Sequence, residues 1–592
     1  MMVLIAAVLC LACVAGLRPR ALRSGVGNRA LSSGSVLHCL PSDTADESIP
    51  HICVVGAGWA GWGAARSLLH AGARVTLVDA ANDPTGELGT TTPTGKPFDA
   101  GQKGFWRDYP NIYGMLPDLK LEISDVLTPC TNSSFYSPYG LEATAPVFGD
   151  SPRLPSPLGQ IAASAALFER LPLADRASVA GLLVAILDLN AATTRIYDCM
   201  TAKELFDRFG LSKRLVDDFL RPTLLVGLFK PPEELSAAVV MELLFFYALS
   251  HQDSFDVRWI KKGSVASSFF LPLHRHLSEQ YPGKYSVKGN SAVREIEVAD
   301  GMVRSVRLST LDSSTKQVTD SVVRPDGIVL AVGAKGLRAI LSQSPTLTKS
   351  SAMLSRAATM GSIDCIAVRL WLDKKVATRS PANVFASFPE LRGAGGTFFM
   401  LDQLQPDEDA LWGGKKKDEE ESRGSVFSCD FYNADALMYL SDEDIVALLL
   451  EKLLPVALPS MRQLQPKVVD SYVKRYPGAV NLFAPNTFNL RPRINDPAVK
   501  NLKVAGDWTW MEDLEPKSKG LCQERAFVSG MEAANAMMTQ LNGQQKNLAV
   551  LPVRDDEIQV ELGRTVTKAV TSQIFQNPLL KVFGGLLFAR RE

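Results

Sequence analysis

The stretch His51-Ile-Cys-Val-Val-Gly-Ala-Gly-Trp-Ala-Gly61 decides the fold. Residues 52–55 form a short apolar run, which is typical of a buried parallel strand. The glycines that follow, Gly56, Gly58 and Gly61, have the G-x-G-x-x-G spacing. In this motif the first glycine permits a tight turn, the second lets a pyrophosphate approach, and the third lets a helix pack closely on the strand. The stretch therefore predicts a strand, a turn and a helix whose N-terminus faces phosphate groups.

A second predicted strand, Val75–Val78, ends in an acidic residue. Asp79 lies 18 residues after Gly61, near the spacing at which a carboxylate accepts hydrogen bonds from ribose hydroxyls. A glycine-rich turn that binds nothing is the alternative, and it gives no reason for the position of this acid. The whole unit therefore predicts a dinucleotide site at the three glycines and Asp79.

The composition is that of an ordinary globular protein. The chain has 592 residues, of which 46% are hydrophobic and 21% charged, and its formal net charge is zero. This length accommodates two or more domains, and the charge gives no indication of a nucleic-acid partner. The nine cysteines are odd in number, and only Cys10 and Cys13 have C-x-x-C spacing, inside an apolar leader. We therefore expect free thiols in a reducing compartment and no structural metal.

The first 45 residues have the features of a targeting leader. Residues 2–16 are apolar but short for a membrane span, which needs about 20 residues, and they resemble a signal-peptide core. Residues 17–42 contain four arginines, many serines and no acid, which is typical of a transit peptide. Residues 1–45 therefore predict a bipartite leader that directs the chain to a complex plastid. A plain secretory signal is the alternative, and the odd, scattered cysteines argue against it.

The middle of the chain, about residues 150–255, is predicted to be mostly helical. Within it, Glu233–Tyr247 has acids at its start and an apolar body, which indicates one helix. Its methionine and aromatic residues are either plain core or the wall of a ligand site. The end of the tail, residues 573–592, is apolar with a basic terminus. It either lies in a membrane interface or docks on the protein's own surface.

Further strands are predicted downstream. Residues 285–298 and 302–308 flank Asp300-Gly301, which indicates a hairpin. Two other apolar runs, 326–334 and 501–507, each open into a glycine turn, as the first strand does. In a doubly wound sheet ligands bind at the carboxyl ends of the strands. The first and last of these segments are therefore expected to hold one long cofactor.

The order of these segments, with Val504-Ala-Gly-Asp507 followed by a helix over about 520–541, resembles the FAD-dependent amine-oxidase superfamily. Within that superfamily it is similar to the carotenoid desaturases and isomerases, zeta-carotene and phytoene desaturases above all. The resemblance extends over most of residues 50–540. It implies an α/β fold in which a Rossmann-type FAD-binding domain is interleaved with an α+β substrate-binding domain. The implied boundaries are 50–115, 285–345 and 495–545 for the FAD-binding domain, 116–284 and 346–494 for the substrate domain, and 546–592 for a C-terminal tail that is a candidate for contact with a membrane interface.

The resemblance also implies eight residues that bind FAD. They are Gly56, Gly58 and Gly61 at the pyrophosphate, Asp79 at the adenosine ribose, Val293 at the adenine, Gly333 beside the adenosine half, and Gly506 and Asp507 at the pyrophosphate and ribityl chain. The implied reaction is removal of a hydride to flavin N5, or a flavin-assisted isomerisation, on a long polyene. In such a reaction the protein mainly positions an apolar chain and excludes water.

Two segments depart from the desaturase pattern. After the acidic strand the family carries a glycine pair and a basic residue, whereas this chain has Gly86-Glu-Leu-Gly-Thr90. The family commonly has a histidine two residues after the next conserved glycine, whereas this chain has Gly101-Gln-Lys103. Lys103 is therefore the candidate catalytic residue, with a phosphate-binding or surface lysine as the alternative. Arg491-Pro-Arg493 either braces the cofactor or a substrate carboxylate or, as we favour, forms a solvated basic turn.

The leading hypothesis is a plastid FAD-dependent oxidoreductase that desaturates or isomerises a hydrophobic, carotenoid-like polyene. Peripheral contact with a membrane and a quinone or oxygen as electron acceptor belong to this hypothesis, and nucleic acid and metal do not. The first alternative is a flavin oxidase of a soluble amine or another small metabolite. The second is a flavoprotein that serves as a non-catalytic assembly partner.

Overall fold

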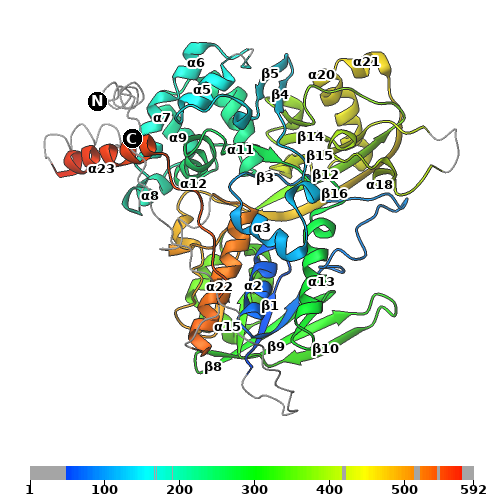
Figure 1. Cartoon of the computed structure of the whole chain (residues 1–592), viewed down its shortest axis with the longest axis vertical. Coiled ribbons are helices and arrows are strands. Elements are labelled where there is room, and N and C mark those ends of the chain that lie inside the picture. Colours follow the sequence, from blue (N-terminus) through cyan, green and yellow to red (C-terminus); the bar gives the residue numbers. More distant parts are fainter. Residues whose placement is uncertain are drawn as a thin grey trace, which may run out of the picture.

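The computed structural model describes residues 49–576 except residues 166, 169, 190, 417–421, 513–519 and 543–546. The predicted leader, residues 1–45, and the end of the tail, residues 577–592, lie outside the described residues. Figure 1 shows a lower body built on one sheet and an upper body built on a second sheet with a group of helices beside it.

The lower body contains five parallel strands in the order β17-β11-β1-β2-β7. Helix α2 (Trp59–His70) follows β1, and α22 (Gln523–Asn542) shares an apolar cluster with it (Figure 1). Because the strands run in one direction, their carboxyl ends lie at one edge of the sheet, and the predicted Rossmann-type α/β fold is confirmed. The strands are β1 (His51–Val55), β2 (Arg74–Val78), β7 (Tyr285–Lys288), β11 (Gly327–Leu330) and β17 (Leu502–Val504).

A three-stranded antiparallel sheet, β10-β9-β8, is attached to this body. The predicted hairpin is confirmed for β8 (Ser291–Ala299) and β9 (Met302–Leu311), which are joined at Asp300-Gly301, and β10 (Val318–Val323) follows. The prediction was wrong for residues 285–288. They form β7 of the parallel sheet, because the chain turns at Gly289-Asn290 before β8 begins.

The upper body contains a seven-stranded mixed sheet in the order β16-β12-β15-β14-β13-β4-β5. Side chains alternate between its two faces. One face is apolar and packs on α19 (Asp442–Ala447) and α20 (Leu454–Ala457). The other face meets the loop that begins at Phe98, whose ring centroid lies 4.7 Å from that of Tyr472. The strands are β4 (Ser133–Ser137), β5 (Gly140–Ala145), β12 (Ser362–Leu372), β13 (Ala382–Phe385), β14 (Gly395–Met400), β15 (Val426–Tyr432) and β16 (Val468–Asn481).

Helices from the middle of the chain lie beside the seven-stranded sheet (Figure 1). The predicted helix over Glu233–Tyr247 begins later, at Ala237, because the N–H of Ser236 donates to Phe483 O and holds Ser236 outside the helix. Its acids therefore precede the helix instead of lying in its first turn. The principal helices are α5 (Leu158–Ser164), α6 (Leu173–Ala177), α7 (Ala180–Leu187), α8 (Ala191–Asp198), α9 (Ala202–Arg208), α11 (Arg221–Gly227), α12 (Ala237–Leu244) and η4 (Phe245–Leu249). By contrast, α13 (Leu271–Gln280) belongs to the lower body (Figure 1), where it joins the apolar cluster of α2 and α22.

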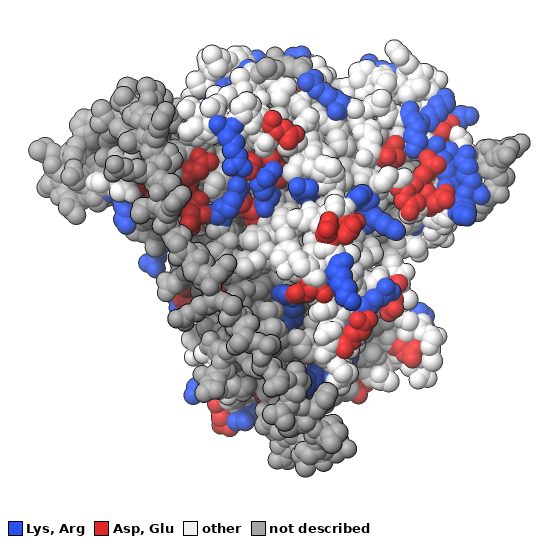
Figure 2. All heavy atoms as spheres, in the orientation of Figure 1, with Lys and Arg blue, Asp and Glu red and all other residues white. Residues whose placement is uncertain are grey.

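The C-terminal helix α23 (Ile558–Gln576) packs against α7, and Arg564 lies over the ring of Phe245, 4.9 Å from its centroid. This part of the tail therefore docks on the protein's own surface. Within the described residues, no helix combines the length and the apolar character that crossing a bilayer requires. On the face shown in Figure 2, cationic and anionic side chains of the described residues are interspersed.

Candidate functional site

Of the three glycines that follow β1, two are packed against backbone atoms and one borders open space. Gly56 has φ +102°, and a methyl group added there would overlap the carbonyl oxygen of Ala331. A methyl group at Gly61 would overlap the carbonyl oxygen of Gly56. At Gly58, by contrast, an added methyl group meets nothing within 4 Å. The protein's own packing therefore requires Gly56 and Gly61, whereas Gly58 borders open space.

This open side fits a phosphate group. Gly58 caps α2, and neither a capping side chain nor an acidic residue lies in the first turn of that helix. A helix N-terminus of this kind attracts anions through its N–H groups and its dipole. Asp79 lies at the edge of the turn, where its Oδ2 accepts a hydrogen bond from Ala57 N at 2.6 Å. The residues present thus fit the pyrophosphate and ribose of a dinucleotide.

The residues predicted for the adenosine half lie on neighbouring segments. The N–H of Ser291 donates to Asp79 O at 2.8 Å, which brings the start of β8, and with it Val293, next to the end of β2. Gly333 caps α14 (Ala334–Ser342), two residues after Ala331, whose carbonyl borders Gly56. The structure therefore places Val293 and Gly333 on either side of the segment that carries the glycine turn.

Gly506 and Asp507 follow β17 at the same edge of the sheet. The N–H of Ala505 donates to Leu330 O, and the N–H of Gly506 donates to Ser529 Oγ of α22 at 2.8 Å. Burial raises the pKa of the Asp507 carboxyl, and the guanidinium groups of Arg525 and Arg491 oppose this rise. The first and last predicted segments thus lie at one edge, as expected for a shared cofactor.

Two buried arginines, Arg491 and Arg525, bind the backbone of the loop after β17. Arg491 was expected in a solvated turn, but its side chain is only 3% exposed and it donates to Trp508 O and Thr509 O. Arg525, which is 0% exposed, donates to Asp507 O and Thr509 O. Arg493 is the solvated member of the motif, since its side chain is half exposed and pairs with Glu512. No local pattern distinguishes Arg525 from an ordinary polar residue of an exposed helix.

Two hydrogen bonds of the Gln523 side chain connect three segments near the glycine turn. Trp59 Nε1 donates to Gln523 Oε1, and Gln523 Nε2 donates to Gly104 O, both at 2.8 Å. Trp59 begins α2, Gln523 begins α22, and Gly104 belongs to the segment that carries Lys103. The helix that faces the predicted pyrophosphate is therefore held in a fixed position relative to residues 98–106, which we call the flavin-side loop.

The flavin-side loop rests on the polar face of the upper sheet. Gly101 has φ +68°, and a methyl group there would lie 2.8 Å from Asp430 Oδ1. Asp430, on β15, is 5% exposed, and burial raises its pKa to about 6, against the charges of Lys103 and Arg369. Lys103 itself is exposed and donates to Ala100 O at 2.6 Å. Sequence reasoning named Lys103 as a candidate but did not name Asp430 and Arg369, which strand register brings to one face of the sheet.

The backbone of residues 86–90 is held by a carboxylate that lies just before it in the sequence. The carboxylate of Asp83 accepts hydrogen bonds from the N–H groups of Gly86, Leu88 and Gly89. These N–H groups are thus bound within the loop. This arrangement accompanies the departure from the desaturase pattern in the same segment.

Apolar and aromatic side chains adjoin the site from the helical side. The ring of Trp106 lies 5.2 Å from that of Tyr247, on η4, and 5.9 Å from that of Tyr109. A methyl group at Gly520, just before α22, would lie 3.0 Å from the Tyr247 ring. The end of the predicted helix over Glu233–Tyr247, which forms η4, therefore contacts Trp106 and Gly520, two residues on segments next to the predicted cofactor site. The rest of this helix contributes to the core.

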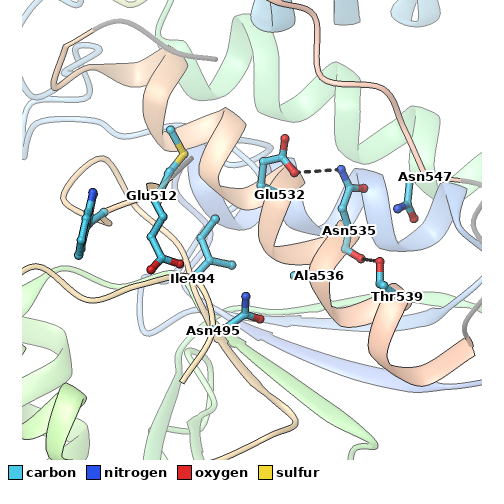
Figure 3. A pocket seen from close by; sticks show the side chains of 10 residues that line it. Ile494, Asn495, Glu512, Glu532, Asn535, Ala536, Thr539 and Asn547 are labelled. Carbon is cyan, nitrogen blue, oxygen red and sulfur yellow. Dashed lines mark hydrogen bonds between the residues drawn. The ribbon is translucent and has the colours of Figure 1, made fainter. Parts of the chain in front are cut away.

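A polar pocket of about 460 Å³ lies elsewhere, on α22 and the segment before β17 (Figure 3). Figure 3 shows Glu532 and Asn535 of α22 on one side and Glu512 on another. None of the eight predicted cofactor residues lines it.

His274 and His276 both lie on α13, and the described residues contain no group of three or more His, Cys, Asp or Glu side chains arranged for a metal ion.

Comparisons with known proteins agree with this geometry. The family model for flavin containing amine oxidoreductases matches residues 60–538. Carotenoid phi-ring synthase of Streptomyces griseus is 26% identical over 533 residues, which are 85% of this chain and 90% of that protein. A chloroplastic/chromoplastic 15-cis-phytoene desaturase of an Oncidium hybrid cultivar is 25% identical over 493 residues, which are 82% of this chain and 77% of that protein.

Among solved structures, cyclohexylamine oxidase from Brevibacterium oxydans IH-35A has a TM-score of 0.56 and 17% identity, and the match covers 83% of this chain and 99% of that one. This likeness concerns the fold alone. The family match, in turn, runs from the first turn of α2 into α22. The chain therefore belongs to the flavin-containing amine oxidoreductases and is an FAD-dependent oxidoreductase.

Proposed function

We propose that the protein desaturates or isomerises a carotenoid-like polyene. The observation that carries this proposal is the aromatic and apolar wall of α12 and η4, which reaches the cofactor segments through Tyr247 and Trp106. Two relatives that match more than four fifths of the chain are named for carotenoid substrates or products. An apolar wall beside a flavin suits a long hydrocarbon chain, because burial of that chain supplies the binding energy.

The residues of the chain act mainly by positioning. FAD, when bound, supplies the hydride acceptor. The glycine turn, Asp79 and Asp507 would hold the cofactor, while Tyr109, Trp106 and Tyr247 would exclude water from the reacting carbon atoms. Lys103 is a cationic side chain of the flavin-side loop, and we propose it as the residue that exchanges protons beside the flavin.

A peripheral membrane contact belongs to the same proposal. Tyr139, Ile161 and Leu173 are 77%, 59% and 76% exposed. Arg170 donates to Tyr139 O and lies over its ring, and Arg176 donates to Ala165 O just after α5. Exposed apolar side chains with flanking arginines suit the boundary between headgroups and acyl chains.

Two further parts belong to the proposal. Residues 1–45 direct the protein to a plastid, and the reduced flavin passes its electrons to a quinone or to oxygen.

Anaerobic incubation of the flavin-loaded protein with a set of carotenoids tests the reaction. Bleaching of the flavin band near ~450 nm together with a new polyene absorption band supports desaturation, and new polyene isomers without net bleaching support isomerisation. Absence of both for every carotenoid overturns the proposal. Pelleting with liposomes tests the membrane contact separately, with a Leu173→Glu variant expected to pellet less.

One observation favours a second candidate, the oxidation of a small polar metabolite. The sheet face that meets the flavin-side loop carries Asp430 and Arg369, both 5% exposed. A purely hydrocarbon substrate cannot form hydrogen bonds or ion pairs with buried charged groups at this face, whereas an amine or another polar group can. Peroxide release with a panel of amines, without any reaction of carotenoids, would support this candidate.

A further inference from the structure

We propose that Arg491 and Arg525 are positioning residues for the flavin half of FAD. They act through the loop after β17, whose carbonyl groups they bind. This inference rests on the FAD site at Gly506 and Asp507. It does not rest on a polyene substrate, so failure of the carotenoid assay leaves it intact.

The two guanidinium groups share three successive carbonyl groups. Arg525 donates from Nε to Asp507 O and from Nη2 to Thr509 O, both at 2.8 Å. Arg491 donates from Nε to Trp508 O at 2.9 Å and from Nη2 to Thr509 O at 3.2 Å. Hydrogen bonds from a charged donor are about twice as strong as those between neutral groups. The carbonyl groups of residues 507–509 are therefore fixed in direction.

Fixing the carbonyl groups also fixes the N–H groups. In a trans peptide the C=O and N–H bonds point in opposite directions. With Asp507 O directed at Arg525, the N–H of Trp508 points the other way, where it donates to the carboxylate of Asp507. The arginine therefore sets both the backbone and the carboxylate that is predicted to face the pyrophosphate and ribityl chain.

The arginines are themselves held in place. Arg491 lies over the rings of Phe483 and Phe488, at 5.9 and 5.3 Å from their centroids. Arg525 Nη1 lies 3.6 Å from Glu242 Oε1 on α12. Both arginine side chains are almost completely buried. Two positive charges held in a low-dielectric interior beside the site also favour the anionic pyrophosphate.

FAD binding by the apoprotein tests the proposal. The apoprotein of the full chain is titrated with FAD, and the dissociation constant is taken from the change in flavin fluorescence. Arg525→Met and Arg491→Met are each expected to weaken FAD binding about tenfold or more, since each removes two charged hydrogen bonds. Arg493→Met is the matched control, because Arg493 lies on the same turn but is half exposed, and its affinity should stay within about twofold of wild type.

Arg525→Lys separates positioning from folding. Lysine keeps the charge, but one ammonium group cannot reproduce the fork that reaches two carbonyl groups and Glu242. Thermal unfolding of each apoprotein is measured beside its FAD affinity. Weaker FAD binding by a folded Arg525→Lys apoprotein supports the proposal even where Arg525→Met does not fold. Wild-type affinity in Arg525→Lys and Arg491→Met, or a loss fully explained by the unfolded fraction, overturns it.

Discussion

The carboxylate of Glu524 accepts two hydrogen bonds from Asn111, one from the backbone N–H and one from the side-chain amide, both at 2.8 Å. A third comes from the N–H of Ile112 at 3.0 Å. Glu524 is 0% exposed, and it joins the first turn of α22 to that of α3 (Pro110–Met115). One buried carboxylate thus connects the helix that follows β17 to the helix that follows the flavin-side loop.

This buried carboxylate predicts a pH dependence of stability. Burial raises the pKa of Glu524 to about 7, and the hydrogen bonds from Asn111 and Ile112 only partly oppose the rise. The pKa of Glu524 is higher in the folded state than in the unfolded state. The contribution of Glu524 to the free energy of unfolding is therefore full below about pH 4.5 and is lost as the pH rises through about 7. In this window the free energy of unfolding should fall by up to about 1.4 kcal/mol per pH unit on account of Glu524.

The Glu524→Gln variant checks this sign. Its free energy of unfolding, from denaturant titrations between pH 4.5 and 7.5, should lack that part of the slope, while Asn111 keeps one acceptor. A slope equal to that of the wild type would show that Glu524 does not titrate in this range.

The glycine turn predicts opposite outcomes for two neighbouring alanine substitutions. In Gly61→Ala the new methyl group overlaps the Gly56 carbonyl, so we expect a loss of about 3 kcal/mol in the free energy of unfolding. In Gly58→Ala the methyl group meets no protein atom within 4 Å. Gly58→Ala should therefore leave apoprotein stability nearly unchanged and weaken FAD binding, because the methyl group occupies the space beside the predicted pyrophosphate. Wild-type FAD affinity in Gly58→Ala would place the cofactor elsewhere.

The parts of the site that depend on local sequence could be predicted. The strand, the glycine spacing and Asp79 lie within 30 residues of one another, and the parallel sheet determines that strand ends such as Gly506-Asp507 meet them. The hairpin at Asp300 likewise follows from its own turn residues.

The other parts depend on contacts that no local pattern contains. Asp430 lies beside Arg369 only because the register of β12 and β15 pairs it with Ala367, which is two residues from Arg369 and on the same face of the sheet. Arg491 was interpreted as solvated because Pro492 and Arg493 beside it are typical of an exposed turn. Its burial depends on the carbonyl groups of a loop 17 residues further along the chain.

The contact between Trp59 and Gln523 predicts a measurable coupling. Trp59→Phe keeps an aromatic ring among its neighbours Phe269, Phe270 and Phe527 but removes the donor at 2.8 Å from Gln523. We expect it to cost about 1–2 kcal/mol in the free energy of unfolding, since a partly buried acceptor loses its partner. In a double-mutant cycle with Gln523→Leu the two effects should be less than additive by about 0.5 kcal/mol or more. Additive effects would show that the hydrogen bond contributes nothing.

The contact between Gly101 and Asp430 can be separated from backbone strain by a matched pair of glycines. Gly101 and Gly89 have nearly the same φ, +68° and +67°, but an added methyl group meets Asp430 Oδ1 at 2.8 Å in the first case and nothing within 4 Å in the second. Gly89→Ala should cost about 1 kcal/mol, the penalty of a left-handed backbone alone.

Gly101→Ala carries this penalty and the overlap with Asp430, whose carboxylate is buried and cannot move into solvent, so we expect a loss larger by about 1–3 kcal/mol. Combining Gly101→Ala with Asp430→Ala should recover most of that excess in thermal or denaturant unfolding, because the overlapping oxygen atoms are gone. Equal losses in Gly101→Ala and Gly89→Ala would mean that the flavin-side loop does not rest on the carboxylate of Asp430.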